Sequence, residues 1–350
     1  MNKIINNSLH KWYSQNKRTL PWREVNDPYL IWISEIILQQ TRVDQGLSYF
    51  NRFIQSFPNV KSLAEADEEQ VLKLWQGLGY YSRARNLHAA AKDIMERFGG
   101  TFPSGYKDIL SLKGIGEYTA AAIASFSFGQ PYAVVDGNVF RVLSRLFSID
   151  DPIDSTMGKK VFTVLAQELL DRENPGTHNQ AIMELGALQC VPNNPDCNKC
   201  PLIDKCLAYA NNSISRYPVK QGKTTVKNRY FNYFDIRDRD HTYIVKRTQN
   251  DIWKNLYEFP LIETTENLPI ELLLKEERFT SLFEKDIQIE LLSQAKHILS
   301  HRIIYANFYK IEIAGNSLTG NMFIKIPASD IHNYPVSRLV HKYIEKYISG

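Results

Sequence analysis

The chain has 350 residues, of which 43% are apolar and 23% charged, and its formal net charge is +4. This composition is that of a soluble globular protein long enough for two domains, which excludes a disordered chain, a collagen-like fibre and a disulfide-rich miniprotein. No apolar run approaches the ~18 residues of a membrane span, and the N-terminus lacks the apolar core of a signal peptide, so we expect a cytoplasmic protein without a membrane partner.

Residues 1–212 have the periodicity of helices, because their apolar residues recur every three or four positions. Short segments with glycine and proline separate the periodic runs. The runs predict helices at 29–40, 69–76, 83–98, 117–126, 139–147, 157–170 and 179–188. We therefore expect an all-helical domain over residues 1–212.

Residues 213–229 have the composition of a linker. Residues 213–230 hold five basic and no acidic residues, whereas residues 1–212 hold 22 of each sign. The excess positive charge thus lies in this one segment. It is explained equally well by contact with a polyanion and by a solvated linker.

Beyond the linker the pattern changes to alternating apolar residues. Strands are predicted at 230–236, 241–245, 287–292, 303–313 and 322–326, with a turn at 238–240 and a closing amphipathic helix at 334–349. We expect an α/β (α+β) domain over residues 230–350.

The four cysteines form a Cys-x6-Cys-x2-Cys-x5-Cys pattern: Cys190, Cys197, Cys200 and Cys206. A cytosolic setting argues against disulfides. Structural zinc usually takes two Cys-x2-Cys pairs, and only one such pair is present. A compact loop of four thiols favours a 4Fe–4S cluster; zinc and inert thiols are the alternatives.

A glycine-rich turn precedes the helix predicted at 117–126. Its sequence is Leu112-Lys113-Gly114-Ile115-Gly116. Glycines allow a tight turn and close approach of another backbone, and a helix N-terminus attracts phosphate. The turn could therefore bind a phosphate backbone, although from these residues alone a plain helix–helix turn is the better explanation.

Two carboxyl groups are candidates for acid chemistry. Glu35 has Ile31, Trp32 and Leu38 as helical neighbours, so burial should raise its pKa; the alternative is a surface glutamate at the edge of the apolar face. Asp136 precedes a predicted helix, as an N-cap would, or could lie beside a developing cation. A proton donor paired with a carboxylate suits cleavage of a glycosidic bond.

The motifs of residues 20–206 resemble those of a known family. The cysteine loop resembles the cluster loop of the endonuclease III (helix–hairpin–helix) superfamily, and the glycine turn resembles its hairpin. Further motifs are similar to adenine DNA glycosylases of the MutY type, in the order Pro21-Trp22-Arg23, Leu38-Gln39-Gln40-Thr41, Gly77-Leu78-Gly79-Tyr80 and Val135-Asp136-Gly137-Asn138.

The resemblance implies roles for these residues. Glu35 would protonate the leaving adenine, and Asp136 would stabilise the sugar cation, assisted by Tyr118 and Asn138. The adenine pocket would consist of Trp22, Arg23 and Gln180. DNA would be contacted by Gln40, Thr41, Leu78, Tyr80, Lys113, Gly114 and Gly116. The four cysteines would bind a structural 4Fe–4S cluster.

Tyr118 also bears on the type of reaction. Endonuclease III-type lyases have a Schiff-base lysine at this place, so the resemblance implies a monofunctional glycosylase that uses water.

The second half resembles the Nudix-like domain with which this family recognises 8-oxoguanine. Residues 296–301 are similar to the lesion-recognition loop, with Ser300 and His301 as contacts, but the phenylalanine usual in the family is Leu299. An ordinary strand turn is the alternative. The half lacks an Arg-Glu-x-x-Glu-Glu motif, so we expect it to bind and not to hydrolyse.

We therefore expect a monomeric enzyme that extrudes and hydrolyses adenine paired with 8-oxoguanine or guanine in double-stranded DNA. One alternative is an endonuclease III-like glycosylase and lyase for oxidised pyrimidines. The other is a non-catalytic iron–sulfur protein that binds DNA.

Overall fold

The computed structural model describes residues 2–222, 225–283, 287–313 and 323–348. The chain forms two compact units: residues 1–65 with 86–222, and residues 66–85 with 223–350. Among the described residues no helix combines the length and apolar character needed to cross a membrane.

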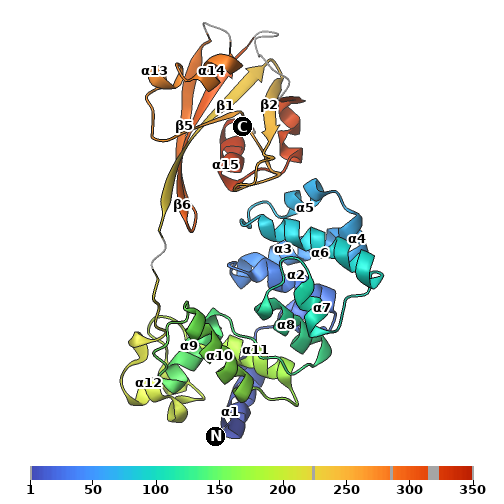
Figure 1. Ribbon diagram of the computed structural model, residues 1–350, viewed down its shortest axis with the longest axis vertical. Helices are drawn as coiled ribbons and strands as arrows, with labels where there is room; N and C mark the ends of the chain where they lie inside the picture. Colours follow the sequence, from blue (N-terminus) through green and yellow to red (C-terminus); the bar gives the residue numbers. More distant parts are fainter. Residues whose placement is uncertain (1, 223–224, 284–286, 314–322, 349–350) are drawn as a thin grey trace. The chain divides into compact units, whose positions relative to one another are not determined.

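The first unit is helical (Figure 1). Its helices are α1 (Asn2–Asn16), α2 (Pro28–Leu38), α3 (Val43–Ser56), α4 (Val60–Glu65), α6 (Ser82–Phe98, of which the first turn groups with the second unit), α7 (Tyr106–Ser111), α8 (Glu117–Phe128), α9 (Gly137–Phe147), α10 (Thr156–Leu169), α11 (Pro175–Leu188) and α12 (Leu207–Ala210). Single 3-10 turns lie at Pro21–Arg23, Cys197–Lys199, Ile203–Lys205 and Ile214–Arg216. The six helices predicted for this unit are all present, with ends that differ by a few residues.

Helix α2 is buried on most sides. Asp27 caps its N-terminus by accepting a hydrogen bond from the Tyr29 N–H, and Pro28 fits the first turn, where no N–H is needed. Nearly every residue from Tyr29 to Ile37 is buried, because α3 and α8 pack against this helix. A glutamate in its middle is therefore forced into the protein interior.

A second core lies between α1, α9, α10 and α11. Leu9, Leu143, Phe162 and Leu185 are buried there. Three of the four cysteines pack against this core: Cys190, Cys200 and Cys206. The cysteine loop is therefore held against the same helices that form the core.

The chain remains attached to the first unit as far as Gly222. The Ile153 N–H donates to the Val219 carbonyl (3.0 Å), and the Asp154 carboxylate accepts from the N–H groups of Gln221 (2.8 Å) and Gly222 (3.0 Å). The first half of the basic segment is therefore ordered on the helical unit.

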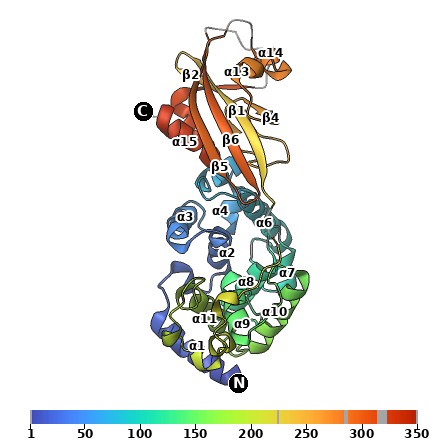
Figure 2. The same ribbon diagram turned by 90° about the vertical axis from the view of Figure 1, so that its left-hand side faces the viewer.

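The second unit is built on a mixed sheet (Figure 2). It contains α5 (Glu68–Leu74), β1 (Lys227–Asp238), β2 (His241–Lys246), β3 (Tyr257–Glu258), β4 (Leu261–Thr264), α13 (Ile270–Leu273), α14 (Glu277–Leu282), β5 (Ile289–Ile298), β6 (Arg302–Glu312), β7 (Ile324–Pro327) and α15 (Arg338–Tyr347), with a 3-10 turn at Ala328–Asn333. The strand order is β3-β2-β1-β6-β5, with β4 paired to β1 and β7 paired to β2. Among the strand pairs of the described residues, only β1–β6 is parallel.

The two faces of this sheet are covered by different helices. Phe234 on β1 packs with Phe279 and Phe283 of the α14 region. Phe308 on β6 stacks on Tyr343 of α15. Because successive side chains of a strand point to opposite faces, both faces of the central strands are apolar.

Segment 66–85 is bound to the sheet of this unit. Glu69 on α5 accepts hydrogen bonds from Lys246 Nζ (2.7 Å) and Tyr257 Oη (2.5 Å), and Arg85 donates to the Lys254 carbonyl (2.9 Å). The helix expected at 69–76 is α5, and it groups with the sheet although it lies between helices of the first unit in the sequence.

Two predictions for the second half need correction. The closing helix begins at Arg338, because Pro335 and Val336 run beside Tyr257 as extended chain and Ser337 caps the helix. The strand expected at 287–292 extends to Ile298, since β5 pairs with β6 along its length. Met322, the first residue of one predicted strand, and Ser349, the last residue of the predicted closing helix, lie outside the described residues.

Candidate active site

A cavity of about 540 Å3 in the helical unit is lined by all of the predicted catalytic and adenine-binding residues. The sequence-predicted residues that line it are Trp22, Arg23, Glu35, Thr41, Tyr118, Asp136, Asn138 and Gln180. They come from α2 and the turns on either side of it, from α8, from the N-terminus of α9 and from α11. The tertiary fold thus brings together residues up to 158 positions apart in the sequence.

Glu35 is the buried carboxyl of this cavity. It is 7% exposed, and its Oε2 accepts a hydrogen bond of 2.7 Å from Tyr118 Oη. Burial raises the pKa of Glu35 to about 7; the Tyr118 hydrogen bond opposes the rise and the Asp136 charge adds to it. Burial therefore raises the pKa of Glu35, as its apolar neighbours in the sequence predicted.

Asp136 caps helix α9 and faces the same cavity. Its Oδ1 accepts from the N–H groups of Asn138 (2.9 Å) and Val139 (2.8 Å), and its Oδ2 accepts from Asn138 Nδ2 (2.8 Å). Burial raises the pKa of Asp136, whereas these three donors lower it. The N-cap that the sequence offered for Asp136 is thus present, and the capping carboxylate also lines the cavity.

The predicted Arg23 is bound by a glutamate that the sequence analysis missed. Glu184 on α11 has no exposed side-chain surface and accepts from Arg23 (2.9 and 2.7 Å) and from Arg18 (2.9 and 2.6 Å). Burial acts to raise the pKa of Glu184, but the hydrogen bonds from the two arginines prevail and lower it to about 2. Its position one helical turn after Gln180 is the signal that could have revealed it.

Two loops carry the residues expected to contact DNA in this unit. Gln40 is exposed, with a φ of +57°, directly before Thr41 at the cavity. In the hairpin, Leu112 and Ile115 are buried while Lys113, Gly114 and Gly116 are exposed. Gly114 has a φ of +80°, and a Cβ there would lie 2.6 Å from the Asn86 Cβ, so this turn requires glycine.

In the second unit, Tyr80 and the predicted recognition loop line one cavity of about 520 Å3. Ser300 and His301 form the exposed turn between β5 and β6, and the Ser300 hydroxyl contacts the Tyr80 hydroxyl. Tyr80 is 45% exposed and has a φ of +46°, whereas Leu78 is buried and does not reach the cavity. Trp253 also lines it and was not predicted from the sequence.

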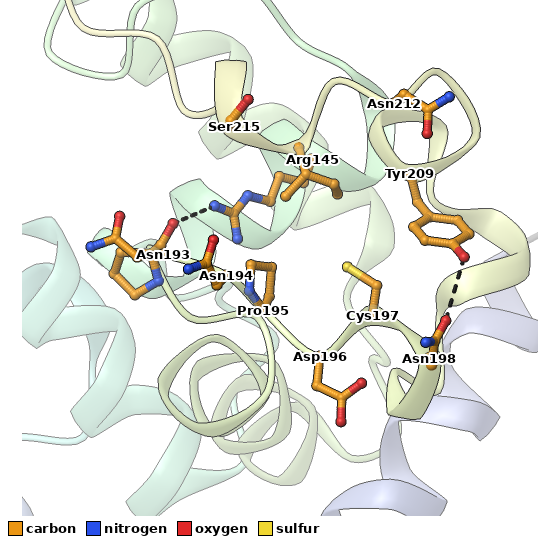
Figure 3. A pocket seen from close by; sticks show the side chains of 12 residues that line it. Arg145, Asn193, Asn194, Pro195, Asp196, Cys197, Asn198, Tyr209, Asn212 and Ser215 are labelled. Atoms are coloured by element: carbon orange, nitrogen blue, oxygen red, sulfur yellow. Dashed lines mark hydrogen bonds between the residues drawn. The ribbon is translucent and has the colours of Figure 1, made fainter.

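The cysteine loop lies at the other end of α9. Cys197 lines a cavity of about 610 Å3 with Arg145 and Tyr209 (Figure 3). Burial raises the pKa of Cys200 to about 11, and the other three thiols add to the rise. Among the described residues, no three His, Cys, Asp or Glu side chains are arranged to hold a metal ion together.

Arg145 gives the cysteine loop an unusual charge environment. Its side chain is 2% exposed, its Nη1 lies 3.4 Å from Cys190 Sγ, and it donates to the carbonyls of Val191 (2.8 Å) and Pro192 (2.9 Å). No ion pair to this guanidinium is found within the described part of the chain. A buried cation beside the Cys190 thiol fits a group that is bound by thiolates.

Comparison with known proteins gives one family match in each half of the chain. Residues 33–166 match the HhH-GPD superfamily base excision DNA repair protein family, and residues 232–346 match the NUDIX domain family. An adenine DNA glycosylase of Buchnera aphidicola subsp. Schizaphis graminum (strain Sg) is 39% identical over 262 residues, which are 75% of this chain and 76% of that protein.

Solved structures support the fold of the helical unit. A thermostable thymine-DNA glycosylase is 28% identical, with a TM-score of 0.56, over 60% of this chain and 97% of that one. An endonuclease III in a non-covalent DNA complex is 20% identical, with a TM-score of 0.52, over 61% of this chain and 98% of that one, and shows the fold alone. The chain is a base excision DNA repair enzyme and belongs to the adenine DNA glycosylase family.

Proposed function

We propose that the chain removes adenine paired with 8-oxoguanine or guanine in duplex DNA by hydrolysis alone, as a monomer in the cytoplasm. The observation that supports this most directly is the cavity shared by Glu35, Asp136 and the side chains expected around adenine. Cleavage of an N-glycosidic bond needs a proton for the leaving base and negative charge beside the sugar cation. Proton donation is assigned to Glu35 and the negative charge beside the sugar to Asp136.

Glu35 is assigned the acid. With a pKa of about 7, a substantial fraction of this carboxyl is protonated at neutral pH, and it can donate to a ring nitrogen of adenine. Tyr118 holds Oε2, and no hydrogen-bond partner of Oε1 is found within the described residues, so Oε1 is assigned the contact with the base. The same burial that raises the pKa thus makes the group a usable acid.

Asp136 is assigned the stabilisation of the sugar cation. Its three N–H donors and its place at the N-terminus of α9 favour the ionised carboxylate. The hydrogen bonds also fix its orientation, so it can oppose the developing charge without rearranging.

Hydrolysis without strand cleavage is supported by the absence of an amine nucleophile. Among the described residues that line the cavity there is no lysine. Tyr118 is no substitute, because burial raises its pKa well above 10 and keeps it a neutral phenol. Water is then the nucleophile.

The cavity of the second unit is assigned to the oxidised base opposite adenine. Aromatic side chains, Tyr80 and Trp253, offer stacking surfaces, and the Ser300 hydroxyl can accept a hydrogen bond from the N7–H that 8-oxoguanine has and guanine lacks. Leu299, in place of the usual phenylalanine, supplies apolar contact only. The hydroxyl of Ser300 would exchange its contact with Tyr80 for the base.

Contact with DNA backbone is assigned to the exposed hairpin at Lys113–Gly116, next to the N-terminus of α8. Thr41, which lines the cavity of Glu35 and Asp136 (the adenine cavity), and the adjacent exposed Gln40 are assigned contacts with the stacked bases of the DNA.

Cys190, Cys197, Cys200 and Cys206 are assigned as ligands of a 4Fe–4S cluster. When bound, such a cluster supplies structural stability to its loop. Arg145 would place its cationic guanidinium beside the ligand Cys190 and tie the loop carbonyls together. Iron and acid-labile sulfide analysis of the purified protein tests this assignment: about four of each per chain supports it, and zinc contradicts it.

The activity is tested with duplexes that contain adenine opposite 8-oxoguanine, adenine opposite guanine, or thymine glycol opposite adenine. We expect breakage of the adenine strand only after alkali. Breakage without alkali would contradict the hydrolytic mechanism, and cleavage at thymine glycol would favour the endonuclease III-like alternative.

Glu35→Gln tests the acid. The variant should bind the mispair and lose excision by about 10²- to 10⁴-fold, because glutamine cannot donate the proton. Glu96→Gln, which changes an exposed glutamate on α6, is the matched control. Retained excision by Glu35→Gln would refute the assignment.

A further inference from the structure

Tyr13 is a buried tyrosine whose hydroxyl reaches the wall of the adenine cavity. It lies on α1, is 6% exposed, and its Oη donates to Gln180 Oε1 over 2.6 Å. Burial raises the pKa of Tyr13, so the hydroxyl keeps its proton. The phenol therefore acts as a donor, and only the oxygen of the amide can accept from it.

Gln180 lies between two cavities. It lines the cavity of Glu35, and it also lines a second one of about 540 Å3 that is bounded by Tyr13, Lys17 and Arg23. The side chain is thus held by one contact from the α1 side, while the rest of its amide is available to a base.

The orientation of this amide decides what it can recognise. A carboxamide can turn by 180° with little change of shape, which exchanges its acceptor oxygen and its donor nitrogen. With Oε1 bound to Tyr13, no hydrogen bond from Gln180 Nε2 is found within the described residues. Nε2–H and the second lone pair of Oε1 are left for the base.

This donor and acceptor pair is the one that matches adenine. Glutamine pairs with adenine through its N7 acceptor and its 6-amino donor, whereas guanine presents two acceptors, N7 and O6, at the same edge. We propose that Tyr13 is a positioning residue that fixes the Gln180 amide in the orientation that recognises the 6-amino group of adenine. The inference rests on the proposed placement of adenine beside Gln180.

The test is Tyr13→Phe, which removes only the hydroxyl. Single-turnover excision is measured opposite 8-oxoguanine for adenine and for purine, which lacks the 6-amino group. In the wild type the 6-amino contact should favour adenine by about 3- to 10-fold. In Tyr13→Phe the amide can turn, so adenine excision should fall by about that factor while purine excision stays within about twofold.

Tyr29→Phe is the matched control. The Tyr29 hydroxyl is also buried and donates over 2.6 Å, but to the Phe57 carbonyl and outside the cavity. Tyr29→Phe should leave the ratio of the adenine excision rate to the purine excision rate unchanged. Adding Tyr13→Phe to Gln180→Ala should change neither rate further, because Tyr13 acts only through Gln180.

The outcomes separate the two proposals. An equal loss for adenine and purine in Tyr13→Phe, or an additive loss in the double variant, would overturn this inference and leave the proposed function intact. A wild-type chain that excises no adenine opposite 8-oxoguanine would overturn the proposed function and this inference with it.

Discussion

Arg141 joins the carboxamide of Asn138 to the backbone carbonyl of Cys190. Its Nη2 donates to Asn138 Oδ1 (2.8 Å) and its Nε donates to the Cys190 oxygen (2.7 Å). Asn138 in turn donates through Nδ2 to Asp136 Oδ2 (2.8 Å). Arg141 therefore fixes the Asn138 amide with its nitrogen toward Asp136 and connects the cavity to the start of the cysteine loop.

Replacing Arg141 should impair excision although the side chain is not assigned a chemical step. In Arg141→Gln the amide of Asn138 loses the contact that orients it, and the position of Asp136 becomes less fixed. We expect single-turnover adenine excision to fall by about 10- to 100-fold, with unchanged affinity for the mispair. Arg172→Gln, at an exposed position, is the control. An unchanged rate would show that Asp136 is held sufficiently by the backbone of α9.

The rate of excision should follow the ionisation of Glu35. The protonated carboxyl is the acid, so the rate should be highest below pH 7 and fall as the pH rises through about 7. In Tyr118→Phe the carboxylate loses the hydrogen bond that favours its ionised form, and the fall should move to higher pH. A pH–rate profile measured in single turnover checks both. If the fall in rate moved to lower pH in Tyr118→Phe, the Tyr118 hydrogen bond would not be lowering the pKa of Glu35.

Glu184 should contribute stability that depends on pH. Its folded-state pKa of about 2 lies below the ordinary value of 4.5, so the contribution is present above about pH 4.5 and is lost as the pH falls toward 2. Glu184→Gln leaves Arg18 and Arg23 without their anion and should lower the free energy of unfolding at pH 7 by about 2 to 3 kcal/mol.

Urea unfolding at pH 7 and pH 3 measures the effect of Glu184→Gln. The difference between wild type and variant should shrink at pH 3. Glu173→Gln, an exposed change just before α11, should behave like wild type at both pH values. A constant difference at the two pH values would mean that packing, and not charge, explains the loss.

Lys113 should affect binding to DNA without affecting recognition of the mispair. If its ammonium group neutralises one phosphate, Lys113→Ala should weaken binding equally for matched and mispaired duplexes. The slope of log K against log salt should decrease by about 1. Fluorescence anisotropy at several salt concentrations checks this, with Lys159→Ala on α10 as the control. A loss confined to the mispaired duplex would remove Lys113 from the backbone contact.

The local features of this protein were accessible from its sequence. Apolar residues at every third or fourth position predicted α2, α8 and α9, because this spacing places them on one face of a helix. Pro28 and Asp27 mark the start of α2, and the glycines of the 112–116 turn mark the hairpin. The motifs around Glu35 and Asp136 could be recognised because each extends over only a few residues.

The surroundings of these residues were decided by the tertiary structure. Glu184 is neutralised by Arg18 and Arg23, which lie more than 160 positions away, so no local pattern contains this pairing. Helix α5 groups with the sheet through Glu69, whose partners Lys246 and Tyr257 lie 177 and 188 positions away in the sequence. The sequence by itself predicted the helices α2, α5, α6 and α8 to α11 and the candidate carboxyl groups, whereas α1, α3, α4 and α7 were not predicted. Burial, pKa and partners depend on packing between distant segments, which only the folded chain defines.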